Sequence, residues 1–242
     1  MSKSSPPKRI PALAEPTPEL KAKAWQMYEL VLATYGHRPN IARRDPMHEL
    51  VSTILSQRTT SQNEERAFQN MWQRYGSWDA IAVADTDELQ ALIAPSNYAE
   101  QKAPRIKAVL QRITAERGTA NIDFLADAPL DEALAWLLAL PGVGPKTATL
   151  VLLFCFARPV LPVDTHVHRV SQRVGLLSAN VDATAAHPLL LAMLPHEPQI
   201  LYNFHVDTLR HGQRICTWST PKCPGCPLLS ICNYGQERLG TR

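Results

Sequence analysis

Four of the five cysteines of this chain lie close together near the C-terminus, in the spacing C-x6-C-x2-C-x5-C. They are Cys216, Cys223, Cys226 and Cys232. A secreted disulfide framework spreads its cysteines over the chain and follows a signal peptide, whereas the N-terminal sequence MSKSSPPKR contains no apolar stretch of that kind. We therefore predict that the four thiolates converge on one metal centre, which folds a proline-rich segment with little apolar core of its own.

Most of the chain carries the apolar periodicity of α-helices, and no convincing alternating run predicts a strand. The predicted class is therefore all-α. Residues 1–18 contain five prolines and no periodic apolar pattern, which predicts a disordered tail. The expected helices begin at Pro18 and Pro46 and then cover about 61–75, 86–93, 99–117, 130–140, 146–156, 165–174, 183–193 and 199–211.

The composition limits where the protein acts and what it binds. The longest apolar stretch, residues 150–157, is far shorter than the roughly 18 residues of a spanning helix. A net charge of +3 permits an anionic partner without requiring one. We expect a cytoplasmic protein that is neither secreted nor bound to a membrane, and that is a monomer.

The sequence LPGVGPKTA at 140–148 joins two apolar helices through a tight turn. Gly142 and Gly144, on either side of Val143, leave the backbone open to the close approach of another molecule. The helix that follows presents unpaired N–H groups and a partial positive charge at the same point, which suits a phosphate. An ordinary tight connection between helices could also use this glycine pair.

Lys146 and Asp164 are the candidate reactive pair. A lysine at a helix N-terminus opposes the helix dipole, and desolvation there favours the neutral, nucleophilic amine. Asp164 precedes an apolar-periodic helix, where an aspartate is an ordinary N-cap. A phosphate-neutralising surface lysine and a simple cap are the alternative interpretations.

Taken whole, the 140–148 string resembles the helix–hairpin–helix motif of base-excision DNA glycosylases, in particular the endonuclease III family. The segment VDTHVHRV at 163–170 and the cysteine loop are similar to that family's segments and occur in the same order. The resemblance implies that Lys146 attacks C1′ of a deoxyribose and forms a Schiff base, that Asp164 stabilises the developing positive charge, and that His166 contacts DNA. It implies removal of an oxidised pyrimidine from duplex DNA, followed by β-elimination at the abasic site.

The same resemblance implies two helical lobes. A six-helix barrel with the hairpin would cover 39–158, and a cluster lobe would combine 19–38 with 159–242. Lys146 would then face Asp164 across a cleft in which damaged double-stranded DNA docks.

The resemblance also assigns a [4Fe–4S] cluster to the four cysteines. Zinc is the competing metal, but zinc ribbons carry two separated C-x2-C pairs and this chain has one. Between the first two cysteines, Lys222 is the only basic residue, where the family has several that contact DNA phosphates.

Two further segments resemble the family's duplex-opening loops. Residues 55–60 read LSQRTT, so Gln57 or Arg58 would fill the space left by an extruded base. Asn97 stands where many relatives have glycine, and Tyr98 is the candidate for the second wedge. A glycosylase for another lesion or a mismatched base, a helix–hairpin–helix DNA-binding protein without catalysis, and a zinc-stapled structural protein remain the alternatives.

Overall fold

The computed structural model describes residues 15–42 and 44–241, so residues 1–14 of the predicted tail lie outside the described part. Within it the chain is entirely helical and contains no strand, which confirms the all-α prediction. The α-helices are α1 (Pro18–Tyr35), α2 (Pro46–Leu55), α3 (Ser61–Tyr75), α4 (Trp78–Val83), α5 (Thr86–Leu92), α6 (Ala99–Arg117), α7 (Leu130–Leu138), α8 (Pro145–Phe156), α9 (Thr165–Val174), α10 (Ala183–Leu191), α11 (Pro198–Arg214) and α12 (Asn233–Leu239). The short 3-10 helices are η1 (Ala94–Ser96) and η2 (Asp123–Ala126).

The first two helices begin where their capping residues predict. The hydroxyl of Thr17 accepts a hydrogen bond from the Leu20 N–H at 3.3 Å, and Pro18 follows as the first helical residue. Asp45 accepts a hydrogen bond from the His48 N–H at 3.0 Å before Pro46. Each of these capping side chains accepts a hydrogen bond from an N–H group that the start of a helix leaves unpaired.

The sequence analysis missed two helices, α4 and α12. They are six and seven residues long, and α4 is apolar at five of its six positions whereas α12 is apolar at two of its seven, so neither displays an apolar stripe. Both have capped starts. The Ser77 hydroxyl accepts a hydrogen bond from the Ala80 N–H at 3.2 Å, and the Cys232 sulfur accepts one from the Gly235 N–H at 3.3 Å.

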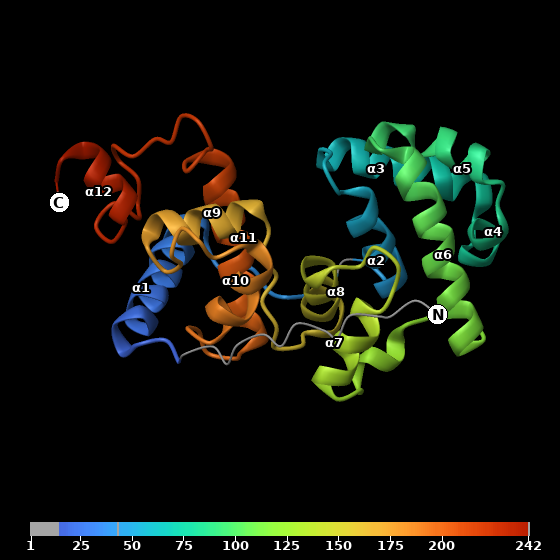
Figure 1. Cartoon of the computed structure of the whole chain (residues 1–242), viewed down its shortest axis with the longest axis horizontal. Coiled ribbons are helices and arrows are strands. Elements are labelled where there is room, and N and C mark those ends of the chain that lie inside the picture. Colours follow the sequence, from blue (N-terminus) through green and yellow to red (C-terminus); the bar gives the residue numbers. More distant parts are fainter. Residues whose placement is uncertain (1–14, 43, 242) are drawn as a thin grey trace, which may run out of the picture.

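The helices form two groups joined through α8 (Figure 1). In one group α11 packs against α1 and α9, and α9 contacts α10 and α12. In the other, α2 contacts α3 and α6, while α4 and α5 pack on α6. Helix α8 contacts α2 and α7 on one side and α10 and α11 on the other. Its N-terminus, which carries the hairpin turn, therefore lies where the two groups meet.

A single set of buried apolar side chains runs through both groups. Helix α8 is apolar along nearly its whole length because neighbours cover it on several sides, and Val151, Leu152 and Leu153 are fully buried. This anchoring fixes the direction in which the first turn of α8 points. Across residues 15–42 and 44–241, every helix is too short or too polar to cross a membrane.

Candidate active site

The turn between α7 and α8 has the backbone that the glycines predict. Gly142 has a φ of 72°, in the left-handed region, and Gly144 is the extended N-cap of α8. A glycine supplies no side-chain oxygen, so the first N–H groups of α8 keep no side-chain partner from their cap. Val143 is buried and anchors the turn between them. The turn therefore offers an exposed, electropositive helix end.

Lys146 is the second residue of α8 and lines a cavity of about 320 Å³ together with Gln57, Gly142 and His187. Burial lowers the pKa of Lys146, and the negative charges of Asp164 and Glu49 oppose this shift only in part. The amine is thus more easily deprotonated than that of a solvent-exposed lysine. A lowered pKa of this kind raises the fraction of neutral amine, which is the form that can act as a nucleophile.

Asp164 is the N-cap of α9, as its position before an apolar-periodic segment predicts. Its Oδ1 accepts hydrogen bonds from the N–H groups of His166 at 2.9 Å and Val167 at 2.7 Å. Of the carboxylates that raise the pKa of Lys146, Asp164 has the largest effect. The structure therefore brings this pair into electrostatic contact from two different helices, and the cap holds the carboxylate in a fixed orientation.

The two candidate duplex-opening segments lie beside each other. Gln57 is half-buried, and its side-chain oxygen accepts a hydrogen bond from Arg105 Nη1 at 3.0 Å. Arg58 is exposed and its guanidinium lies 5.5 Å from the centre of the Tyr98 ring. Tyr98 is 45% exposed, so part of its ring is free to contact another molecule. Asn97 links the segments by donating to the backbone oxygen of Arg58 at 3.2 Å.

His166 and Lys222 lie outside the cavity at Lys146. The His166 ring nitrogen Nδ1 is 3.1 Å from Nη2 of Arg169, and its Cβ is so close to Gly212 that a side chain there would collide with it. Lys222 is exposed at the edge of the cysteine pocket. Neither side chain is among those lining the Lys146 cavity.

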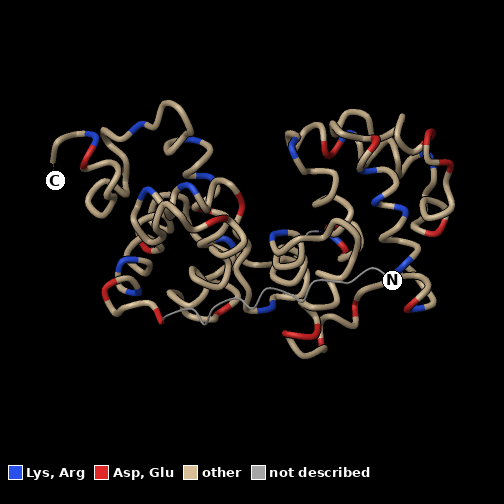
Figure 2. Tube along the Cα trace, in the orientation of Figure 1, with Lys and Arg blue, Asp and Glu red and all other residues tan. Residues whose placement is uncertain are grey.

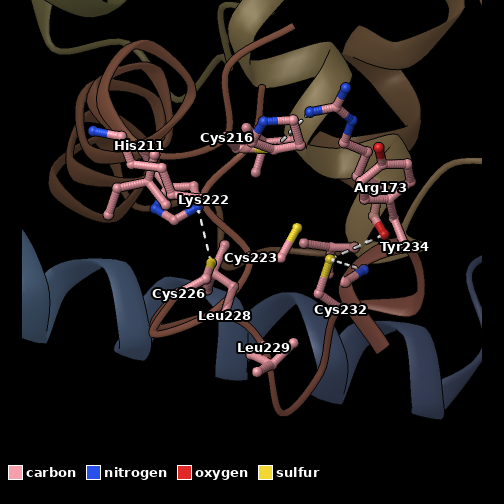
Figure 3. Close-up of a pocket in the computed structure, with 15 residues that line it drawn as sticks. Arg173, His211, Cys216, Lys222, Cys223, Cys226, Leu228, Leu229, Cys232 and Tyr234 are labelled. Atoms are coloured by element: carbon pink, nitrogen blue, oxygen red, sulfur yellow. Dashed lines mark hydrogen bonds between the residues drawn. The ribbon is translucent and has the colours of Figure 1, made fainter. Parts of the chain in front are cut away.

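All four clustered cysteines line one pocket between α9, α11 and α12, with their sulfurs turned inward (Figure 3). Cys223 and Cys232 are buried, whereas Cys216 and Cys226 are half-buried. None forms a disulfide. Burial raises the pKa of Cys226 to about 11 and also raises that of Cys232. Because burial favours the protonated thiols, these cysteines would become thiolates only beside a positive charge.

Donors around this pocket suit thiolate ligands. Arg173 Nη1 donates to the Cys216 sulfur at 3.3 Å, and the Gly235 N–H donates to the Cys232 sulfur at 3.3 Å. Hydrogen bonds of this kind stabilise cluster thiolates. Within the described residues no three His, Cys, Asp or Glu side chains are grouped tightly enough to hold a single metal ion.

Sequence reasoning missed the residues that support both sites. Arg169 Nη2 donates to the Gly212 oxygen at 2.8 Å and the Cys216 oxygen at 2.9 Å, and Arg173 Nη1 donates to the Thr217 oxygen at 2.7 Å. These two arginines on α9 hold the start of the cysteine loop. Arg169 and Arg173 lie four residues apart, one helical turn, and this spacing is the only signal for them in the sequence. On α6, Lys102 donates to the backbone oxygen of Gln57 and Arg105 donates to its side-chain oxygen, so these two residues support the 55–60 segment in the same way.

Charge is unevenly distributed around α8 (Figure 2). Lys and Arg residues run along α6, whereas Asp and Glu gather on the outer side around α4 and α5 and beyond α7. A nearly neutral chain thus places part of its positive charge on a helix adjoining the candidate site.

Comparisons with known proteins agree with this geometry. Residues 51–192 match the family model described as "HhH-GPD superfamily base excision DNA repair protein". Endonuclease III of Thermotoga maritima is 34% identical over 200 residues, which are 82% of this chain and 88% of the relative. Endonuclease III of Synechocystis sp. is 32% identical over 218 residues, covering 89% of this chain and 94% of the relative.

A solved non-covalent endonuclease III–DNA complex has the same fold, with a TM-score of 0.78 and 24% identity over 91% of this chain and 98% of that one. A trapped covalent endonuclease III–DNA intermediate matches with the same TM-score over 90% of this chain. The hairpin turn, the Lys146–Asp164 pair and the cysteine pocket therefore lie in a shared helical framework. The chain belongs to the HhH-GPD superfamily of base excision DNA repair proteins and, within it, to the endonuclease III family of DNA glycosylases.

Proposed function

We propose that this protein is a bifunctional DNA N-glycosylase and abasic-site lyase that removes oxidised pyrimidines from duplex DNA. The observation that carries the proposal is the cavity-lining amine of Lys146, whose pKa is lowered by burial and which is coupled to the carboxylate of Asp164. Relatives named endonuclease III have been solved with DNA, one as a trapped covalent intermediate.

In the proposed reaction, neutral Lys146 attacks C1′ of the damaged nucleotide and the bond from C1′ to the base breaks. The base leaves with the bonding electrons and takes up a proton. The Asp164 carboxylate stabilises the positive charge that develops on the sugar. Opening of the sugar ring gives an imine between Nζ of Lys146 and C1′. Removal of a C2′ proton then expels the 3′ phosphate, and water hydrolyses the remaining imine to release the lysine.

DNA binding in this proposal uses the hairpin turn and the two neighbouring segments. The free N–H groups at the start of α8 would bind a backbone phosphate beside Gly142 and Gly144, without reading sequence. Gln57, Arg58 and Tyr98 would fill the stack that the extruded nucleotide leaves. We assign the hairpin to a barrel lobe at 39–158 and the cysteine pocket to a lobe of 19–38 with 159–242, with DNA between them in the cytoplasm.

The four cysteines fit a [4Fe–4S] cluster, because their thiols share one pocket and hydrogen-bond donors reach two of the sulfurs. Cys216, Cys223, Cys226 and Cys232 would each supply one thiolate. Bound there, the cluster would crosslink the C-terminal segment and take no part in the base-excision steps. Lys222 beside the pocket would contact a phosphate.

The test is borohydride trapping on duplexes that carry thymine glycol, uracil, a mismatch or a preformed abasic site. We expect a covalent adduct on the abasic and thymine glycol duplexes, and its loss in Lys146→Ala. DNA binding by the wild-type protein without any adduct would instead identify a non-catalytic DNA-binding protein. An adduct that forms with uracil or a mismatch in preference to thymine glycol would support the proposed Schiff-base mechanism. It would contradict the proposal that oxidised pyrimidines are the substrate.

A further inference from the structure

Lys102, on the first turn of α6, is almost completely buried at 2% exposure. Its ammonium group donates to three backbone oxygens, those of Leu55 at 2.7 Å, Gln57 at 2.8 Å and Ser96 at 2.5 Å. An ammonium group has three N–H donors and no acceptor, so this arrangement uses all of them. The acceptors belong to two separate segments, which we call the 56–60 loop (with the preceding Leu55) and the 94–98 loop.

Both loops contain backbone conformations that side chains rarely adopt. Arg58, Asn97 and Tyr98 have φ values of 55°, 58° and 51°. Such conformations persist only where surrounding contacts impose them, and they concentrate at functional sites. Here the Asn97 amide donates across to the Arg58 oxygen at 3.2 Å, and the Arg58 guanidinium faces the Tyr98 ring. The two loops therefore hold each other in shapes that neither sequence favours alone.

Arg105 lies one turn beyond Lys102 on the same face of α6 and extends the contact to the hairpin. Its Nη1 donates to the side-chain oxygen of Gln57 at 3.0 Å. Its aliphatic stem lies against Gly142, where a Cβ would come within 2.1 Å of Arg105 Cδ. One face of α6 thus contacts both loops and the hairpin turn.

We propose that Lys102 and Arg105 are positioning residues that hold the 56–60 loop, the 94–98 loop and the 141–144 turn as one rigid unit, which enters and opens duplex DNA. The role of this unit in base excision rests on the proposed function. Its role in binding and opening DNA does not require catalysis. Neither residue would touch the reacting sugar. Both would set the positions of Gln57, Arg58 and Tyr98 relative to the phosphate bound at α8.

Lys107 provides a matched control. It lies on the same helix and also uses its ammonium group to hold a connection, donating to the Ala84 oxygen and to the Thr86 hydroxyl at 2.9 Å. These acceptors, Ala84 and Thr86, precede and begin α5, and neither belongs to the two loops or the turn. Lys107→Met therefore removes similar hydrogen bonds without loosening the DNA-facing unit.

The experiment compares wild type with Lys102→Met, Arg105→Gln and Lys107→Met in two assays. In the first, 2-aminopurine placed opposite a tetrahydrofuran abasic analogue reports unstacking by its fluorescence, which requires no catalysis. In the second, single-turnover excision from a duplex is compared with borohydride trapping on a single-stranded abasic oligonucleotide. We expect Lys102→Met to lose the fluorescence rise and to slow duplex excision by at least about tenfold, because small misplacements of positioning groups cost up to roughly 100-fold.

Trapping on the single strand should stay within about twofold of wild type, because opening a duplex is not required there. Lys107→Met should match wild type in both assays. A normal fluorescence rise in both Lys102→Met and Arg105→Gln would overturn the inference, as would an equal loss of excision and single-strand trapping. If Lys102→Met fails to fold, Arg105→Gln alone decides by the same criteria. Failure of the wild-type protein to trap would refute the proposed chemistry and leave the fluorescence test valid.

Discussion

The side chain of Arg105 lies directly against Gly142, so that a Cβ at position 142 would come within 2.1 Å of Cδ and 2.2 Å of Nε. The glycine also has a φ of 72°. The positive φ favours glycine at this point of the hairpin, and a side chain there would also displace the Arg105 side chain.

Gly142→Ala should consequently be destabilised, by about 2–4 kcal/mol from strain at positive φ and from overpacking against Arg105. The matched control is Gly144→Ala. Gly144 has a φ of −100°, and a Cβ there would meet nothing within 4 Å. Urea unfolding should show a clear loss for position 142 and a change of under about 1 kcal/mol for position 144. Equal losses at both positions would contradict this account.

Lys146→Met should abolish borohydride trapping and yet leave a more stable protein. The substitution removes a cation that burial and the N-terminus of α8 both disfavour. Relief from the helix dipole alone is worth about 0.3–1 kcal/mol. Thermal unfolding of the two proteins at low salt checks the second expectation, and a lower melting temperature for the variant would show that the lysine serves the fold.

Asp164→Asn separates capping from charge. The amide oxygen can still accept from the His166 and Val167 N–H groups, so the free energy of unfolding should change by less than about 0.5 kcal/mol. Loss of the carboxylate charge should slow excision by roughly 100-fold to 1,000-fold. Asp164→Ala should lose both functions. Near-normal excision by the asparagine variant would reduce Asp164 to a helix cap.

Opening of duplex DNA should weaken as the pH rises through about 8. Burial, together with the charge of Arg105, lowers the pKa of Lys102 to about 8, while Glu100 opposes the shift. Below that pH the ammonium satisfies three oxygens, whereas above it the neutral amine has only two N–H groups for them. The ratio of duplex excision to single-strand trapping should therefore fall between pH 7 and pH 9. Both reactions require neutral Lys146, so its titration affects them equally and cancels in the ratio. A ratio that stays constant over this pH range would contradict the prediction.

The cysteine pocket should bind iron and not zinc. The purified protein should absorb broadly near ~400 nm and contain about four irons per chain. Cys232→Ser should lose both the absorbance and the folding of the C-terminal segment, because it removes one thiolate ligand, although the serine hydroxyl can still cap α12. A colourless protein that contains one zinc would instead identify a structural zinc site.

The sequence predicts the helices well where a full apolar stripe and its caps are present. The range 99–117 matches α6, and 165–174 matches α9. Helices α4 and α12 were not predicted because α4 is apolar at nearly every position and α12 at only two, so neither displays an apolar stripe. The hairpin, Lys146, Asp164 and the four cysteines can be proposed from the sequence alone because their spacing is local.

The residues that position the site could not be identified in the same way. Lys102 looks like any helical lysine until folding brings the 56–60 and 94–98 loops to its amine. Arg173 reaches the cysteine pocket only because α9 packs beside it. Contacts between distant segments of the chain define both roles, and a single sequence contains no record of such contacts.

The pairing of α1 with α11 affects how the chain is made. Helix α1 is synthesised before α11, so its buried face, which includes Met27 and Val31, has no partner until the helices between them have been made. Helices α2–α8 emerge in between and can pack against one another earlier. A message cut short before α11 would therefore yield a chain with an uncovered apolar helix, which cellular proteases would degrade before it could occupy DNA.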